Sequence, residues 1–286
     1  MSERATRPLP SALLTDTRGI LCRSGFGGGT HISMNGMWNS CRESGDHGVI
    51  NTWDRTPYLT TVRTGEPSLI PAYNNVTRNL FISDYNSFDG IDNDDGSSYY
   101  DISHNVFYLN EGLKSDYHGH DKRYHHNINI GAGVCCFQFG FISGRDACRG
   151  GSCPNGGDVP GPEEFYEAGH TDHCFSNRCI QRPGGSWISG AYAILWGCNA
   201  SLPGCAPPGK QVMEVQGNTI YREPGRPCGF ESGCDVACGM GSSNTSMLSI
   251  ADFESKCGRA VGAAVRPVPS AQEIEEWSRE LLSVPK

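Results

Sequence analysis

Short apolar segments, each preceded by an asparagine, recur through the middle of the chain. Apolar and polar residues alternate within them, which is typical of β-strands. No helical pattern separates successive segments, so the recurrence predicts strands stacked in a solenoid. In such a stack the asparagines can form an inward ladder of hydrogen bonds that satisfies the turn backbone. The segments lie at 76–81, 102–107 and 125–130, and the asparagines are Asn79, Asn105, Asn127, Asn177 and Asn218.

Two pairs of matching tripeptides give the repeat distance. Gly90-Ile91-Asp92 matches Gly112-Leu113-Lys114, and His104-Asn105-Val106 matches His126-Asn127-Ile128. Both offsets are 22 residues, a spacing that suits one solenoid coil per repeat. We therefore expect an all-β fold with about 22 residues per coil.

We expect one elongated domain, because segments rich in Gly, Pro and Cys interrupt the solenoid pattern without replacing it. An N-terminal lead-in at 1–28 precedes the solenoid at 29–222, which carries loop insertions at 56–73, 143–169 and 198–210; a Cys-rich irregular segment at 223–268 and a C-terminal helix at 269–286 follow.

The last segment differs in kind from the rest of the chain. Ser270 and Glu273 have the spacing of a helical capping box. Ile274, Trp277 and Leu281 then share one face of the predicted helix. We expect this helix to cover the terminal coil or to pack along one side of the solenoid.

Cysteine content sets the expected compartment. The chain has 14 cysteines among its 286 residues, an even number and more than a cytosolic chain ordinarily carries. We expect disulfides that staple the loops, with a connectivity that the sequence leaves open. Sequons at Asn75, Asn199 and Asn244 agree with secretion. Residues 1–11 contain no apolar signal-peptide core, so we expect an extracellular protein whose signal peptide is not in this chain.

Charge and hydropathy exclude some partners. The net charge is −8 and the isoelectric point is near 5.6, which argues against nucleic acid or an anionic membrane as the main partner. No apolar run approaches the roughly 18 residues of a membrane span.

Charged residues gather around the repeat that begins at Gly90. Stacking Gly48, Gly90 and Gly112 would align side chains about 4.8 Å apart on successive coils. Neighbouring carboxylates at that separation repel, which raises one pKa and suits a general acid. A lysine beside them would neutralise part of the charge or act as a base. The aligned columns are His47, Asp89 and Glu111; Ile50, Asp92 and Lys114; and Thr52, Asp94 and Asp116, so the candidate catalytic residues are Asp89, Glu111, Lys114, Asp92 and His47.

Alternatives stay open for the same residues. Asp89 and Asp95 suit corner turns that they would cap through side-chain to backbone bonds. Asp92 and Lys114 suit a surface ion pair worth less than about 1 kcal/mol. The oxygen-rich run at 92–96 suits Ca²⁺, the one cofactor that the sequence suggests. Its candidate ligands are Asp92, Asp94, Asp95 and Asp116.

Aromatic and basic residues around this region suit a sugar-binding surface, although each also suits the core, the rim or a turn. The candidates for substrate binding are Trp53, Arg55, Tyr99, Tyr117, His118 and His120.

The recurring strands, the asparagine ladder and the 22-residue spacing resemble the right-handed parallel β-helix, or pectin-lyase-like, superfamily over roughly residues 29–221. Residues 86–92 are similar to the Asn-Thr-Asp-Gly-Ile-Asp stretch of polygalacturonases, which carry an Asp-Asp pair where this chain has Asn110-Glu111. Lys114 is similar to a strand lysine of chondroitinase B and alginate-type lyases, which carry an arginine one coil later, at Cys135 here.

The resemblance implies a secreted protein that cleaves a polysaccharide, as a glycoside hydrolase or a polysaccharide lyase, in a groove along the coils. The competing hypothesis is a non-catalytic glycan-binding or extracellular matrix protein, in which the charged columns cap corners. Both hypotheses give the protein a polysaccharide or glycan partner, and the second adds extracellular assembly.

Overall fold

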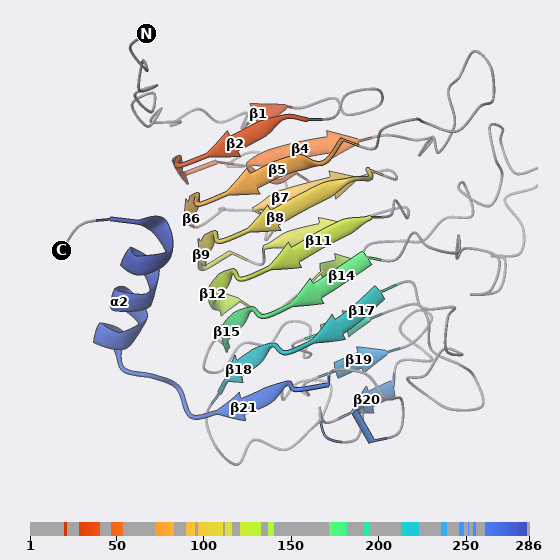
Figure 1. Ribbon diagram of the computed structural model, residues 1–286, viewed down its shortest axis with the longest axis vertical. Coiled ribbons are helices and arrows are strands. Elements are labelled where there is room, and N and C mark those ends of the chain that lie inside the picture. Colours follow the sequence, from red (N-terminus) through yellow and green to blue (C-terminus); the bar gives the residue numbers. More distant parts are fainter. Residues whose placement is uncertain are drawn as a thin grey trace, which may run out of the picture.

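The computed structural model describes residues 20–21, 29–40, 47–53, 72–82, 90–94, 97–110, 112–115, 121–132, 137–139, 172–181, 192–194, 213–222, 236–238, 246–248, 251, 254–255 and 261–284. Most of these residues belong to parallel strands, and a helix, α2 (Ala271–Leu282), follows them near the C-terminus (Figure 1). Among the residues described by the structure, no helix is long and apolar enough to cross a membrane.

The strands form three parallel sheets that the chain visits in turn, an order that fits an all-β parallel solenoid. Sheet 1 contains β1 (Ile20–Leu21), β4 (Ile50–Trp53), β7 (Ile91–Asp94), β10 (Leu113–Ser115) and β13 (Phe137–Phe139). Sheet 2 contains β2 (His31–Ser33), β5 (Asn74–Thr77), β8 (Tyr100–Ser103), β11 (Lys122–His125), β14 (Asp172–Phe175) and β17 (Met213–Gln216). Sheet 3 contains β3 (Gly36–Trp38), β6 (Leu80–Ile82), β9 (Val106–Tyr108), β12 (Ile128–Ala132), β15 (Arg178–Gln181), β18 (Thr219–Tyr221) and β21 (Ala264–Arg266).

A smaller sheet follows sheet 1, and its strand β16 (Tyr192–Ile194) contacts β13. This smaller sheet joins β16 to β19 (Val236–Cys238) in parallel, and β19 to β20 (Ser246–Leu248) in antiparallel orientation.

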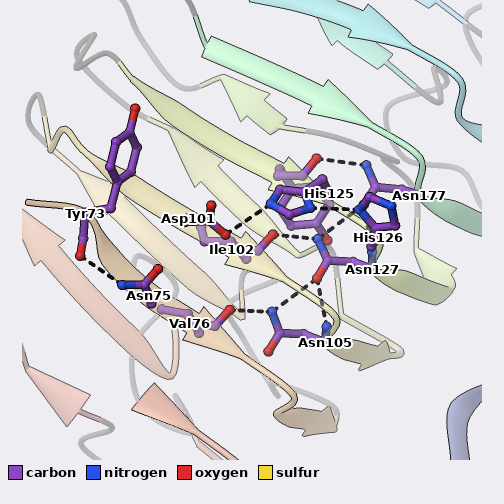
Figure 2. A network of polar contacts seen from close by, with 11 residues as sticks. Tyr73, Asn75, Val76, Asp101, Ile102, Asn105, His125, His126, Asn127 and Asn177 are labelled. Atoms are coloured by element: carbon purple, nitrogen blue, oxygen red, sulfur yellow. Dashed lines mark hydrogen bonds and ion pairs between the residues drawn. The ribbon is translucent and has the colours of Figure 1, made fainter. Parts of the chain in front are cut away.

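A ladder of asparagines holds the turns between sheets 2 and 3. The backbone N–H and the Nδ2 of Asn105 both donate to Oδ1 of Asn127, at 2.9 and 3.1 Å. The Nδ2 groups also donate back to strand carbonyls, as Asn105 does to Val76 at 2.8 Å (Figure 2). The predicted ladder is confirmed, and it begins one coil earlier than predicted, at Asn35. Its members are Asn35, Asn79, Asn105, Asn127, Asn177 and Asn218.

The coils differ in length. Successive ladder asparagines are 44, 26, 22, 50 and 41 residues apart. The predicted repeat of 22 residues therefore holds between Asn105 and Asn127, and the other coils between ladder members are longer. Each segment predicted as one strand is two strands, because the asparagine and a left-handed residue before it, such as His104 with φ 57°, form a turn. The predicted insertions lie outside the described residues, except for residues 72 and 73.

Alternate residues of all three sheets point into one apolar core, as the pleat of a strand requires. Ile91 of sheet 1, Ile102 of sheet 2 and Phe107 of sheet 3 are all fully buried in it. The rings of Phe81 and Phe107 stack with their centroids 4.7 Å apart, which continues the core from one coil to the next. The solenoid interior is thus filled with side chains.

Polar groups enter this core in pairs. Lys122 Nζ lies 3.6 Å from Asp172 Oδ2, with both side chains buried, and the Lys122 backbone N–H donates to Asp172 Oδ1 at 2.7 Å. Tyr124 donates its hydroxyl to Asn129 Oδ1 at 2.5 Å, and burial raises the pKa of this tyrosine. Cys174 and Cys179, which are also buried, are both disulfide-bonded.

Helix α2 packs along one side of the solenoid, against the outer face of sheet 3 (Figure 1). Ile274, Trp277 and Leu281 contact a cluster that includes Val106 and Ile128, whose neighbours in the strands face the core. The predicted capping box of Ser270 is present, with the Glu273 N–H donating to Ser270 Oγ at 3.3 Å. Of the two predicted positions, the structure therefore favours the side of the stack over its end.

Candidate functional site

The register of sheet 1 aligns the charged residues of successive coils. Leu113 pairs with Ile91 and Lys114 with Asp92, so the predicted alignment of the second and third glycines is confirmed. The first coil is shifted by one residue, because Ile50 pairs with Ile91. Asn51, and not Ile50, therefore lies beside Asp92. Gln138, and not Cys135, lies one coil beyond Lys114.

Asn51, Asp92 and Lys114 form a row that points away from the core, because each alternates with a core residue. Lys114 Nζ lies 3.2 Å from Asp92 Oδ1. Asn51 Nδ2 donates to Asp92 Oδ2 at 2.8 Å. His47 Nδ1 lies 3.2 Å from the same Asn51 nitrogen and 3.9 Å from Asp92 Oδ2. We call these residues, Asp92, Lys114, Asn51 and His47, the Asp92 cluster.

Burial separates the members of the Asp92 cluster. The side chains of Asp92 and Lys114 are 0% and 10% exposed, whereas that of His47 is 56% exposed. The alternative interpretation of Asp92 and Lys114 as a surface ion pair is therefore wrong, because the pair is buried. Desolvating two charges is costly, so such a pair adds little net stability, but removing one partner is strongly destabilising.

The inward row beside the Asp92 cluster is also polar. Thr52 Oγ1 donates to Ser97 Oγ at 3.0 Å and accepts from Asn93 Nδ2 at 2.7 Å. All three side chains are fully buried. Most buried polar groups are hydrogen-bonded, and these bonds join β4 to β7 beneath the Asp92 cluster.

The other predicted site residues divide into two groups. Tyr99 lies at the corner before β8, where its ring meets that of Tyr73 edge to face at 5.7 Å. Trp53 and Asp94 pair with each other in sheet 1, but only their strand positions are described. The remaining candidates, Asp89, Glu111, Arg55, Tyr117, His118, His120, Asp95 and Asp116, lie outside the described residues.

The described residues contain no group of three or more His, Cys, Asp or Glu side chains arranged to hold a metal ion. Of the predicted Ca²⁺ ligands, Asp92 has a described side chain, and its two oxygens face Lys114 and Asn51. A cation-binding role for Asp92 would have to displace the lysine.

A second polar cluster lies on the outer face of sheet 2 (Figure 2). His125 Nε2 lies 3.1 Å from Asp101 Oδ1, and His125 Nδ1 lies 2.8 Å from His126 Nδ1. The His104 ring stacks on that of His126 at 5.2 Å, and the Phe175 ring stacks on that of His125 at 4.6 Å. The sequence favoured a solvated or turn-forming role for His125 and His126 over a ligand role, although the match of His104 to His126 was a signal that their rings would stack.

The electrostatics of this second cluster follow from burial and from its own charges. Burial opposes ionisation of Asp101, but the hydrogen bond from His125 and its charge outweigh burial and lower the pKa of the carboxyl group. Burial and then the neighbouring imidazoles lower the pKa of His104. Burial, followed by His125, lowers the pKa of His126 in the same way. The cluster therefore favours an ionised Asp101 and neutral imidazoles at His104 and His126.

Comparisons with known proteins add no relative: no family model, no curated protein and no solved structure matches the chain.

Proposed function

We propose that the protein is a secreted carbohydrate-active protein that cleaves a polysaccharide at the Asp92 cluster. We further propose that its solenoid is a right-handed parallel β-helix of the pectin-lyase-like type, with loops stapled by disulfides. The parallel order of the three sheets supports this fold assignment. The assignment of function relies on the site, because one fold serves many functions.

The Asp92 cluster carries the proposal. A buried aspartate and lysine, held 3.2 Å apart on the outward row of a sheet, are a costly arrangement where apolar residues would serve stability as well. The pair lies directly behind an exposed imidazole, that of His47. Buried charge placed behind an accessible titratable group is typical of sites that transfer protons.

The contacts of His47 define what its ring can do. The Asn51 amide nitrogen can only donate, so His47 Nδ1 accepts and the neutral ring carries its proton on Nε2. That Nε2–H can donate to an oxygen of a bound sugar. When Nδ1 is also protonated, it faces Asp92 Oδ2, 3.9 Å away, and the carboxylate stabilises the imidazolium. His47 is thus suited to general acid–base chemistry.

Asp92 and Lys114 act on the polymer through His47 in this proposal. Their burial keeps them from direct contact with a sugar, so they are positioning residues. Hydrolysis would need a carboxylate in contact with the substrate, for which Asp89 and Glu111 remain the sequence-predicted candidates. Elimination would need one base beside the sugar, and His47 provides a group of that kind.

The test is product release from a panel of neutral, uronic-acid and sulfated polysaccharides, with Ca²⁺ and with a chelator. Reducing ends and the ultraviolet absorbance of unsaturated sugars are followed together. New reducing ends without absorbance indicate a hydrolase, and absorbance indicates a lyase. Folded protein that releases no product across the panel contradicts the proposal.

A matched histidine controls for loss of structure. His47→Gln should lower product release by about 10²- to 10⁴-fold, whereas His31→Gln, at an exposed position of the end strand β2, should leave it unchanged. Equal loss in both variants would contradict a role for His47.

The burial of Asp92 favours a second candidate, a non-catalytic glycan-binding or matrix protein. In that case the Asp92 cluster has a structural role between the strands of sheet 1, and the wild-type protein binds glycan without releasing product. Affinity measurement on the same panel, with wild type and His47→Gln binding equally, would support this second function.

A further inference from the structure

We propose that His125 and His126 bind a divalent transition metal ion such as Zn²⁺ on the outer face of sheet 2, with Asp101 orienting His125. This site lies on a different sheet from the Asp92 cluster and does not depend on the proposed polysaccharide activity.

The facing nitrogens of the two rings carry the proposal. His125 Nδ1 and His126 Nδ1 lie 2.8 Å apart, with the ring planes 86° from each other. Asp101 accepts from His125 Nε2 at 3.1 Å, so in the neutral form of the His125 ring the lone pair is at Nδ1. His126 either donates a proton to that lone pair or, in its other tautomer, presents a second lone pair beside it. A metal cation can take the place of the proton that the two nitrogens share in the hydrogen bond.

A zinc ion fits between the two nitrogens after a small separation. Zn–N bonds are about 2.0–2.1 Å long, so tetrahedral coordination places two ligand nitrogens about 3.3 Å apart. The rings need to separate by only about half an ångström from their present distance. Water would complete the coordination, because His126 is exposed.

The surroundings hold both rings in place. The Phe175 ring stacks on His125 at 4.6 Å and 6°, and the His104 ring stacks on His126 at 5.2 Å and 7°. The bond from Asp101 fixes the tautomer of His125, as carboxylates commonly do behind metal-binding histidines. Rings that are already oriented lose less entropy when they bind an ion.

The turn itself does not require histidine at these positions. Residue 126 has φ 53°, and the matching left-handed position holds His104 one coil earlier but Arg78, Ser176 and Gly217 in other coils. The position of His125 is occupied by Ser103 one coil earlier. The adjacent pair of histidines is therefore a property of this coil and not of the turn.

The test is titration of the full-length protein with Zn²⁺ near pH 7.5, competed against a chromophoric chelator. The variant is His125→Ser/His126→Gly, which installs residues found at matching positions of this chain. Glycine relieves the positive φ, so the fold should be kept. We expect the wild type to bind one Zn²⁺ more than the variant. Equal stoichiometry and affinity in the two proteins would overturn the proposal.

Two further variants sharpen the result. Asp101→Asn should weaken the same ion by about 10- to 100-fold, as loss of such an orienting group does at other metal sites. His173→Asn is the control, because His173 contacts a carboxylate of Glu214 at 3.3 Å but forms no such pair with another imidazole among the described residues. An Asp101→Asn protein that binds as tightly as wild type would remove the assigned role of Asp101, and a loss of the ion in His173→Asn would place the site elsewhere.

Discussion

Two buried lysine–aspartate pairs in this protein have similar geometry and different surroundings. Asp92 and Lys114 lie 3.2 Å apart, and Lys122 and Asp172 lie 3.6 Å apart. The second pair faces the core, with both side chains at 2% exposure or less. The first lies on the outward row of sheet 1, behind the exposed His47. Burial alone therefore does not distinguish the two pairs, whereas contact with an exposed imidazole does.

The largest effect should follow from breaking the core pair. Asp172→Ala leaves Lys122 buried without this carboxylate and without the acceptor for its backbone N–H. We expect a loss of about 3–5 kcal/mol in the free energy of unfolding, measured by chemical denaturation. Glu214→Ala, which removes the exposed partner of His173, should change stability by less than about 0.5 kcal/mol. Equal effects in the two variants would show that the core pair is not special.

The asparagine ladder should come next in the size of its effect. Asn105→Ala removes the acceptor for Asn79 and the donor to Asn127, all in a buried turn. We expect a cost of about 1–3 kcal/mol for the buried groups left unsatisfied. Asn35→Ala, at the partly buried first member of the ladder, should cost less. A lower denaturation midpoint for Asn35→Ala than for Asn105→Ala would contradict the greater contribution of the buried ladder members to stability.

At the pair of Asp92 and Lys114, His47→Gln should lower activity without lowering stability. The side chain is exposed, so unfolding should change by less than about 0.5 kcal/mol. Activity should fall by about 10²- to 10⁴-fold, the usual contribution of a general acid or base. Parallel melting curves and product assays measure both quantities.

The smallest effect is a pH dependence from sheet 2. His104 and His126 have pKa values below the ordinary 6.5 in the folded protein. The unfolded chain therefore binds more protons as the pH falls below about 6.5, and folding stability decreases in that window. Asp101, whose pKa is lowered from 3.8, contributes stability that is lost only at more acidic pH. His126→Gly should flatten the first decline, as thermal melting between pH 7.5 and 5 would measure; an unchanged slope would contradict this assignment.

The parts of the structure that follow from local pattern could be predicted from sequence. The ladder asparagines are recognisable because each precedes an apolar strand, and the alignment of Asp92 with Lys114 held because that coil contains no insertion. The first coil was predicted one residue out of register, and such a slip exchanges the two faces of a strand. Asn51 was therefore overlooked.

Contacts across longer coils could not be predicted in this way. Lys122 and Asp172 are 50 residues apart, and the length of the intervening coil is not encoded in the strand pattern. The contact of His125 with Asp101 also depends on the register of β8 and β11. Asp101 pairs with Arg123 of the next coil, and His125 lies two residues further along that strand. Chemistry that arises from stacked coils becomes visible only when each coil's length is known.

The most direct test of the contrast between the two pairs is to assay His47→Gln and Asp172→Asn side by side. Product release per folded molecule is measured on the polysaccharide that the wild type cleaves best. The free energy of unfolding of each variant is measured separately by chemical denaturation. The account predicts that His47→Gln loses activity at unchanged stability, and that Asp172→Asn loses stability while its folded fraction keeps full activity. An active His47→Gln protein, or a wild type that cleaves nothing in the panel, would contradict the assignment of the Asp92 cluster as a catalytic site.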